Sequence, residues 1–449
     1  MANYWRSRTD LVAPKFSGTD FSGVTNFTTA WYQCTSLTEF PKIDTSNGTV
    51  FIEAWASCAA LTSFPKLDMS SGTNFSYTWR TCYGLTSFPI IDTSSGTTFY
   101  WTWDGCSGLT SFPALDMSSG TNFTRTWIGC TSLTSFPVVT FTTDADDDVN
   151  FTSTWEGCTG LTSFPSYLNL ARGTNFTSAW KGCTGLTSFP AVTFSLTASD
   201  DVNFTEAWRD CTQLESFPAL NLSRGTIFTN AWRGCTDASF TSFPAVTFST
   251  TGSDSIAFDY AWYGCTALES FPALNLSRGT NFSNAWASCT GLTSFPALDL
   301  SNATNFNAAW YGLNNVGFTS FPSGIDLSSG TGFSSTWMNC SKLTSFPALD
   351  LSSGTYFGQC WRSLRDMVSF GACTFPTSGS YSLYLAFAEC DSMTSFPTVD
   401  LSMASSVSWT WYACHALTSF PALDISTCTN FSAAWWADNN IVAFGACNM

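Results

Sequence analysis

The sequence predicts an α/β solenoid of about 17 coils, with one parallel sheet and short helical turns. Three columns of repeating residues support this prediction. A Phe that is usually preceded by Ser and followed by Pro stands at 17 positions, from Phe40 to Phe444, at intervals of 24 to 28 residues. A Trp repeats in 16 of these units, with Phe387 as the exception, and a Cys repeats in 14. A short internal period of this kind is typical of solenoids.

The spacing within one unit predicts its elements. The apolar residues of a representative unit lie three or four positions apart, at Phe75, Trp79, Cys82 and Leu85. This spacing predicts one face of a short helix, with Thr73 or Asn74 as its N-cap. Residues 85–88 then read as a short strand that Pro89 ends, because proline has no N–H for a ladder. Gly96 supplies the conformational freedom for the return turn.

A single unit cannot bury its apolar stripe, whereas stacked units can. We therefore expect the Phe, Trp, Cys and Leu columns to form continuous ladders, with neighbouring strands about 4.8 Å apart. Trp101 lies outside the Trp column and should be more exposed than Trp127, which lies in it. The predicted organisation is an N-terminal cap over 1–20, built on the imperfect half-coil 11–16, and a solenoid over 21–449.

The repeated phrase AWxGCTGLTSFPALDLSSGTNFSxAWxGC resembles the BspA-like leucine-rich repeats of bacterial surface proteins. The stretch Asp44-Thr45-Ser46-Asn47-Gly48-Thr49 matches the segment that precedes the helix in that family. Trp stands here where the family usually has Phe or Met. The resemblance covers about residues 20 to 449 and implies a leucine-rich-repeat-type solenoid with a non-catalytic role in recognition or adhesion at a surface.

Composition excludes several partners. The net charge is −16, which argues against nucleic acid and against an anionic membrane surface. No stretch of 18 apolar residues exists, so no membrane span is expected. Residues 1–16 lack the apolar core of a signal peptide. Together with the surface role of the resembled family, this favours an extracellular protein or a virion component.

The sequence predicts no enzyme and no cofactor. His415 is the only histidine, so a Ser-His-Asp triad would depend on this residue alone. The glutamates are scattered and suggest no acid–base pair.

Calcium is the one metal for which the sequence contains candidate ligands. Asp144, Asp146, Asp147 and Asp148 form an acidic cluster, and calcium prefers several oxygen ligands. The alternative is a solvated acidic loop. A second group of aspartates repeats once per coil, as at Asp44, Asp68 and Asp92, and each is expected to accept N–H groups of its own turn.

Most of the 18 cysteines are expected to be buried thiols, because 14 share the periodicity of Phe and Leu. Disulfides between neighbouring coils are the alternative. Four cysteines outside the column are likelier to react than the column thiols, although these too are expected to be mostly inert: Cys360, Cys373, Cys428 and Cys447.

A column of threonines should face outward from the strand. Its members are Thr62, Thr86, Thr110, Thr134, Thr162 and Thr187. Such a hydroxyl face could bind a glycan or ice. It is equally well explained as a β-surface that requires small, β-compatible side chains.

The function predicted from these features is non-enzymatic recognition or adhesion, with an extended repeat surface displayed on a cell or a virus particle, such as a phage tail or fibre adhesin. The expected partners are a host-surface glycan or protein, or other virion or surface proteins. The alternative is a structural protein that associates end to end into filaments or forms part of a virion shell. A minor alternative is an ice- or mineral-binding solenoid.

Overall fold

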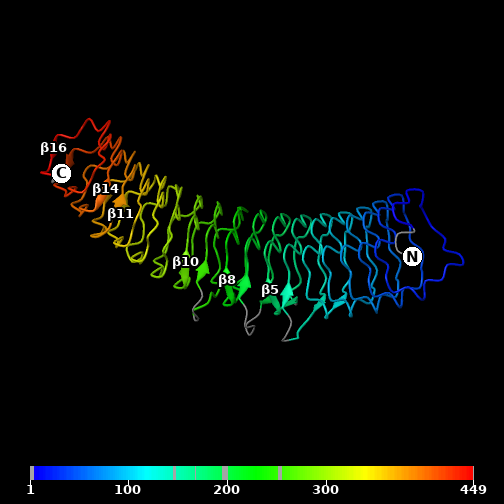
Figure 1. The fold of residues 1–449 in the computed structure, drawn as a ribbon. Helices are drawn as coiled ribbons and strands as arrows, with labels where there is room; N and C mark the ends of the chain where they lie inside the picture. The colour runs from blue at the N-terminus through cyan, green and yellow to red at the C-terminus, as the bar shows by residue number, and fades with distance from the viewer. Residues whose placement is uncertain (1–4, 145–147, 167, 195–200, 251–254, 448–449) are drawn as a thin grey trace. The chain divides into compact units, whose positions relative to one another are not determined.

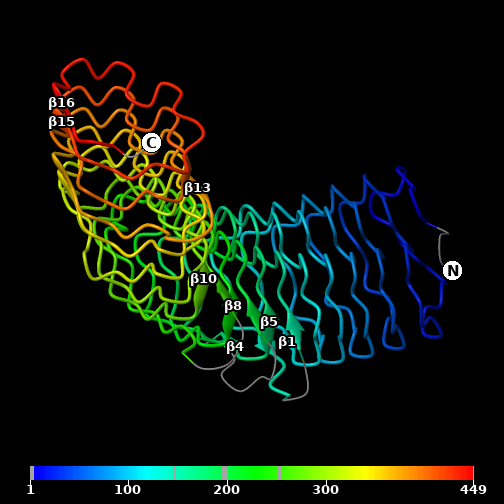
Figure 2. The ribbon, with the colours of Figure 1, turned by 60° about the vertical axis from the view of Figure 1, so that its left-hand side comes forward.

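The computed structural model describes residues 5–144, 148–166, 168–194, 201–250 and 255–447 of the chain. The chain forms two compact units, Met1–Gly225 and Thr226–Met449. Within each unit the backbone winds in successive coils that lie side by side (Figures 1 and 2). Each unit is a stretch of parallel β-solenoid, in agreement with the repeating columns of the sequence.

Every strand is two or three residues long, and every pairing is parallel. The strands of the first unit are β1 (Asp116–Met117), β2 (Thr140–Phe141), β3 (Val149–Asn150), β4 (Asn169–Leu170), β5 (Gly173–Asn175), β6 (Thr193–Phe194) and β7 (Val202–Asn203). The remaining strands are β8 (Gly225–Ile227), β9 (Ile256–Ala257), β10 (Gly279–Asn281), β11 (Ser345–Phe346), β12 (Ser369–Phe370), β13 (Tyr381–Ser382), β14 (Ala404–Ser406), β15 (Ser419–Phe420) and β16 (Ala443–Phe444).

Parallel pairing recurs at three positions of the coil, whereas the sequence predicts one sheet. The first position is the anchor Phe and the residue before it, as in β11 with β12. The second contains the repeating Asp, as in β1 with β2. The third directly precedes the Phe that lies four residues before the column Trp, which we call the core Phe, as in β3 with β5. The prediction of a single sheet is therefore wrong. The two additional ladders are too narrow to leave an alternating pattern of apolar and polar residues in the sequence.

The expected helical turns are absent from the described residues, which contain no helix. In the segment 75–82, alternate amides bond to the next coil: Tyr77 N–H donates to the Tyr100 carbonyl at 2.8 Å, and Trp79 N–H to the Thr102 carbonyl at 2.9 Å. The amides between them donate three residues back, as Cys82 N–H does to the Trp79 carbonyl. We call this stretch, from core Phe to column Cys, the turn segment. No described helix could cross a membrane.

Left-handed residues explain why the turn segment is not helical. Tyr77 and Thr81 have φ of 58° and 56°, and the equivalent residues of the following coil, Trp101 and Gly105, have 57° and 67°. Tyr77 and Thr81 stand at the third positions of the turns Phe75–Thr78 and Trp79–Cys82, where a type II turn requires positive φ. A left-handed residue at every fourth position keeps the spacing i, i+4, i+7 of the apolar residues. It also frees alternate N–H groups for the neighbouring coil.

Aromatic ladders fill the core. In the first unit, column Trp rings of adjacent coils stack with centroids 5.1–5.9 Å apart and planes within 9° of parallel. Each also meets an anchor Phe edge to face, as Trp79 meets Phe88 at 4.8 Å. The prediction of a buried Trp column is confirmed from Trp31 to Trp411, while Trp435 is only half-buried. Phe387 stacks in the column in place of Trp.

The first residues continue these ladders. Trp5 stacks on Trp31 with centroids 5.6 Å apart, and Phe16 lies 5.9 Å from Phe40. Phe21 stacks on Phe27 at 6.5 Å. The division of the chain at residue 20 stays a prediction.

Candidate functional site

The threonine column forms one continuous row in the first unit. Thr62, Thr86, Thr110, Thr134 and Thr162 are exposed, and Thr187 is half-buried. Each hydroxyl donates to the carbonyl of the Thr one coil earlier, as Thr110 Oγ1 does to the Thr86 oxygen at 3.2 Å. The hydroxyl protons are thus used inside the ladder, and the row presents oxygen lone pairs and methyl groups outward.

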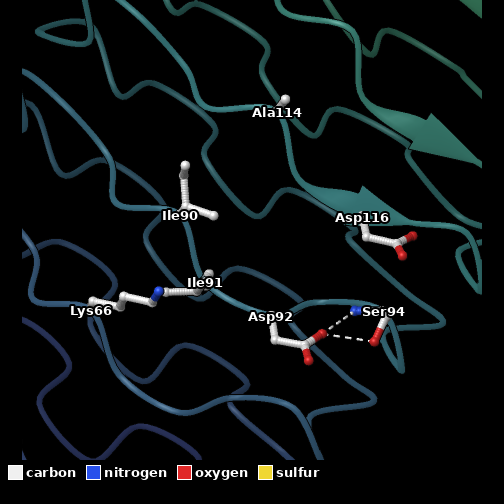
Figure 3. Close-up of a pocket in the computed structure, with 7 residues that line it drawn as sticks. All are labelled: Lys66, Ile90, Ile91, Asp92, Ser94, Ala114 and Asp116. Carbon is white, nitrogen blue, oxygen red and sulfur yellow. Dashed lines mark hydrogen bonds between the residues drawn. The ribbon is translucent and has the colours of Figure 1, made fainter.

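Separate shallow hollows lie beside the repeating aspartates. Figure 3 shows one of them, where Lys66, Ile90 and Ala114 come from three successive coils and lie opposite Asp92 and Asp116. The volume of this hollow is about 430 Å³. Another hollow, of about 470 Å³, is lined by residues that include Lys15, Lys42 and Asp44.

The repeating aspartates form the expected turns. Asp92 Oδ1 accepts the Ser94 hydroxyl at 2.7 Å and the Ser94 N–H at 3.0 Å. These bonds, the hydroxyl first, hold the pKa of Asp92 below its usual value. Asp44 and Asp68 repeat the arrangement with Ser46 and Ser70. The expectation that each Asp satisfies its own turn is confirmed.

The proposed calcium ligands are only partly described. Asp146 and Asp147 lie outside the described residues. Asp144 donates its backbone N–H to Thr142 Oγ1 at 3.1 Å, and Asp148 precedes β3. The described residues contain no group of three or more candidate ligands that could hold a metal ion. Calcium binding at this cluster stays a prediction.

The cysteine column is a row of buried thiols. Cys82 Sγ donates to the Trp55 carbonyl at 3.1 Å, and burial raises its pKa to about 12. No disulfide occurs in the described part of the chain, which confirms the prediction of buried thiols. Of the four cysteines outside the column, Cys360 and Cys373 are buried, in agreement with inert thiols, while Cys428 and Cys447 are partly exposed.

Native alkylation should therefore label two cysteines. Cys428 and Cys447 are partly exposed, whereas the other 16 are buried. Treatment of the folded chain with iodoacetamide, followed by mass spectrometry, should modify these two and leave Cys82 unmodified. The denatured chain, in which every thiol is accessible, is the control. Rapid labelling of Cys82 in the folded chain would contradict the buried column.

His415 contacts a carboxylate. Its Nδ1 lies 2.9 Å from Asp391 Oδ1, and its side chain is exposed. No hydrogen bond in the described part of the chain joins it to a Ser, Thr or Cys side chain. The geometry gives no support to a nucleophilic triad, and a non-enzymatic role stays a prediction.

The outward side chains of the turn segments form a second surface, which we call the turn face. The repeating columns of the sequence do not reveal it, because its side chains change from coil to coil. Ion pairs join neighbouring coils here: Lys181 Nζ lies 2.6 Å from Glu206 Oε2, and Arg80 Nε lies 3.0 Å from Asp104 Oδ2. The side chains at these positions vary from coil to coil, while the core residues stay the same. This contrast is the feature of the sequence that indicates the turn face.

No family model and no curated protein matches the sequence. Among solved structures, the chain is similar to a leucine-rich repeat protein from Bacteroides ovatus, with 15% identity and a TM-score of 0.43, over 86% of this chain and 78% of that one. It is also similar to a leucine-rich cell surface protein from Faecalibacterium prausnitzii, with 16% identity and a TM-score of 0.30, over 86% and 83% of the two chains. TM-scores this low decide neither family nor function.

Proposed function

We propose that this chain is a non-enzymatic recognition protein of the BspA-like leucine-rich-repeat kind. It would display its repeated surface on a cell or a virus particle, in the manner of a tail or fibre adhesin. The observation that carries the proposal is the unbroken row of outward threonines from Thr62 to Thr187. A row of identical groups at coil spacing suits a ligand that is itself repetitive.

The chemistry of the row narrows the range of ligands that it could bind. Because each Thr hydroxyl donates inside the ladder, a ligand gains most by supplying hydrogen-bond donors. Glycan hydroxyl groups supply them. Single contacts of this kind are weak, but several on one chain act together, and avidity can exceed single-site affinity by about 10²–10⁴.

The proposal includes one coil for each anchor Phe, and thus 17 coils. The backbone supports this count, because left-handed residues recur at two fixed places, two residues before and two residues after each column Trp. In one coil these are Thr29 and Gln33, and in the next Glu53 and Ser57.

Substitution of the threonine row tests the adhesion proposal. A variant carrying Thr86→Ala, Thr110→Ala and Thr134→Ala together should lose binding to a polymeric host glycan about 10²-fold or more, while Thr110→Ala alone should do little. The measurement is retention on glycan-coated sensor chips, with short oligosaccharides of the same glycan as a second arm.

A second outward column provides the matched control. Thr49, Thr73 and Thr97 make the same hydroxyl bond to the preceding coil but belong to a different ladder. Their triple alanine variant should bind like the unchanged chain. Equal losses in both triple variants, or no binding to any glycan, would contradict adhesion through the Thr62–Thr187 row.

End-to-end association is the second candidate, favoured by one observation. Residues 436–444 expose apolar side chains, with Trp436 at 59%, Phe444 at 56% and Val442 at 88% of their surface. Exposed apolar side chains beside a strand invite association with another chain. Sedimentation across a concentration series should then show growing species, and Val442→Lys should suppress them.

The remaining proposals have direct tests. Ice binding through the acceptor row would appear as inhibited recrystallisation, which Thr110→Ala should weaken. Calcium binding would appear as a rise in the melting temperature on addition of calcium and its loss in Asp148→Asn.

A further inference from the structure

Trp101 lies between two guanidinium groups on the turn face. The Arg80 Cζ atom of the preceding coil lies 4.9 Å from its ring centroid, and the Arg125 Cζ atom of the following coil lies 4.4 Å from it. Tyr77 lies 5.8 Å from the same ring, and Tyr100 meets Tyr77 edge to face at 5.2 Å. These five residues form one surface cluster across three coils, which we call the Arg–Trp cluster.

The fold does not require these side chains. The positions equivalent to Trp101 in other coils of the first unit hold Glu53 and Ser153, with the same positive φ of 53°. The core stack passes through Trp103, which is fully buried, whereas all five cluster residues are partly exposed. Packing therefore does not explain why two arginines and three aromatic residues meet here.

The charges leave Arg125 as the less committed of the two arginines. Arg80 is paired with Asp104, whereas no ion pair in the described part of the chain involves Arg125, which interacts with Asp104 only at longer range. A guanidinium that stacks on a ring keeps its N–H edges free, and those edges match a carboxylate with two parallel hydrogen bonds. The stacking on Trp101 also holds the Arg125 side chain in place, which lowers the entropy lost on binding.

We propose that the Arg–Trp cluster is a docking site for a partner protein that places an Asp or Glu side chain against Arg125. Tyr, Trp and Arg are the residues that dominate the binding energy of protein interfaces. A sugar ring fits less well, because guanidinium groups already lie over the Trp101 ring on which it would stack. The site lies on the turn face and goes beyond glycan binding by the threonine row.

A peptide selection on the full chain tests the proposal. A displayed library of random peptides is selected on the immobilised chain, and the best peptide is measured by fluorescence anisotropy. The selected peptides should share an Asp or Glu. Trp101→Ala and Arg125→Gln should each weaken binding by about 30-fold or more, as residues that dominate an interface do. Arg125→Lys should recover only part of the loss, since lysine lacks the planar fork.

Arg209→Gln is the matched control, because Arg209 is a turn-face arginine already paired with Glu206 and Asp210. Its affinity should stay within about twofold of the unchanged chain, as expected for a residue outside the interface core. Near-UV circular dichroism checks that each variant is folded. If Trp101→Ala does not fold, the claim that the core does not need Trp101 fails, and Arg125→Gln still tests the docking site.

Three results would overturn the proposal: no peptide is selected, the selected peptides lack acidic residues, or Trp101→Ala and Arg125→Gln bind as well as the unchanged chain. Binding of an acidic polysaccharide that both variants abolish, with no peptide binding, would assign the cluster to a glycan instead. None of these outcomes depends on Thr86, Thr110 or Thr134, so failure of the threonine row is distinguishable.

Discussion

Trp127→Ala should lower the free energy of unfolding by about 3–5 kcal/mol, the range for large-to-small changes at fully buried aromatic sites. The Trp127 ring has no exposed surface. It stacks between Trp103 at 5.7 Å and Trp155 at 5.8 Å, and it meets Phe136 edge to face at 4.9 Å. Alanine would leave a cavity in the middle of the ladder and remove these three ring contacts together with a fourth, the edge-to-face contact with Phe112 at 5.3 Å.

Trp101→Ala is the matched control, because it removes the same side chain from the turn face. It should cost about 1–2 kcal/mol, since cation–π contacts at exposed sites contribute about 0.5–1 kcal/mol each. The measurement is the urea midpoint of each variant, followed by near-UV circular dichroism. Equal midpoints for Trp101→Ala and Trp127→Ala would contradict the assignment of Trp127 to the core and Trp101 to the surface.

Cys106→Asp should have a comparable effect for an electrostatic reason. Cys106 is fully buried, and its Sγ donates to the Trp79 carbonyl at 3.1 Å. A carboxylate there would meet no cation, and an uncompensated buried charge costs about 3–5 kcal/mol. Cys106→Ala keeps the site apolar and should lose much less. Similar urea midpoints for the two variants would contradict a dry thiol column.

The chain contains a natural counterpart of this substitution in its last coil, where Asp438 occupies the Cys position. Its Oδ1 accepts the Cys414 N–H at 2.6 Å, while its buried Oδ2 has no hydrogen-bond partner. Burial is the main cause that raises the pKa of Asp438 to about 6. Folding of the last coil therefore makes the neutral form of Asp438 more favourable than it is in the unfolded chain.

Because of this raised pKa, the stability of the last coil depends on pH. The neutral form of Asp438 contributes stability that is complete below the ordinary value of 3.8 and is lost as pH rises through about 6. Asp438→Cys should remove this dependence. Amide hydrogen exchange of residues 431–437 at a series of pH values measures it, and an unchanged pH dependence in Asp438→Cys would assign the effect to another group.

The columns of the core could be predicted from the sequence because they depend on side chains alone. Phe75, Trp79 and Cys82 repeat with their apolar character, so stacking is the only way to bury them. The Asp92 turn was predictable for a similar reason, since Asp and Ser two residues apart form a local hydrogen bond whatever the fold.

The backbone of the turn segment could not be predicted in the same way. A helix and a chain of tight turns with a left-handed residue at every fourth position both place Phe75, Trp79 and Cys82 on one side, so the spacing does not distinguish them. The left-handed positions hold Tyr77, Thr81 and Trp101, and none of these residue types signals positive φ. Only in some coils does the sequence indicate positive φ, because a glycine such as Gly105 or Gly129 stands at the second left-handed position.

The most direct test of the account is circular dichroism of the full chain. The account predicts an amide spectrum without the helical signature, because alternate N–H groups of each turn segment bond to the next coil. It also predicts an exciton couplet from indole rings stacked 5.1–5.9 Å apart. The couplet should weaken in Trp127→Phe. A helical spectrum with no couplet would contradict the stacked solenoid on which the proposed surfaces depend.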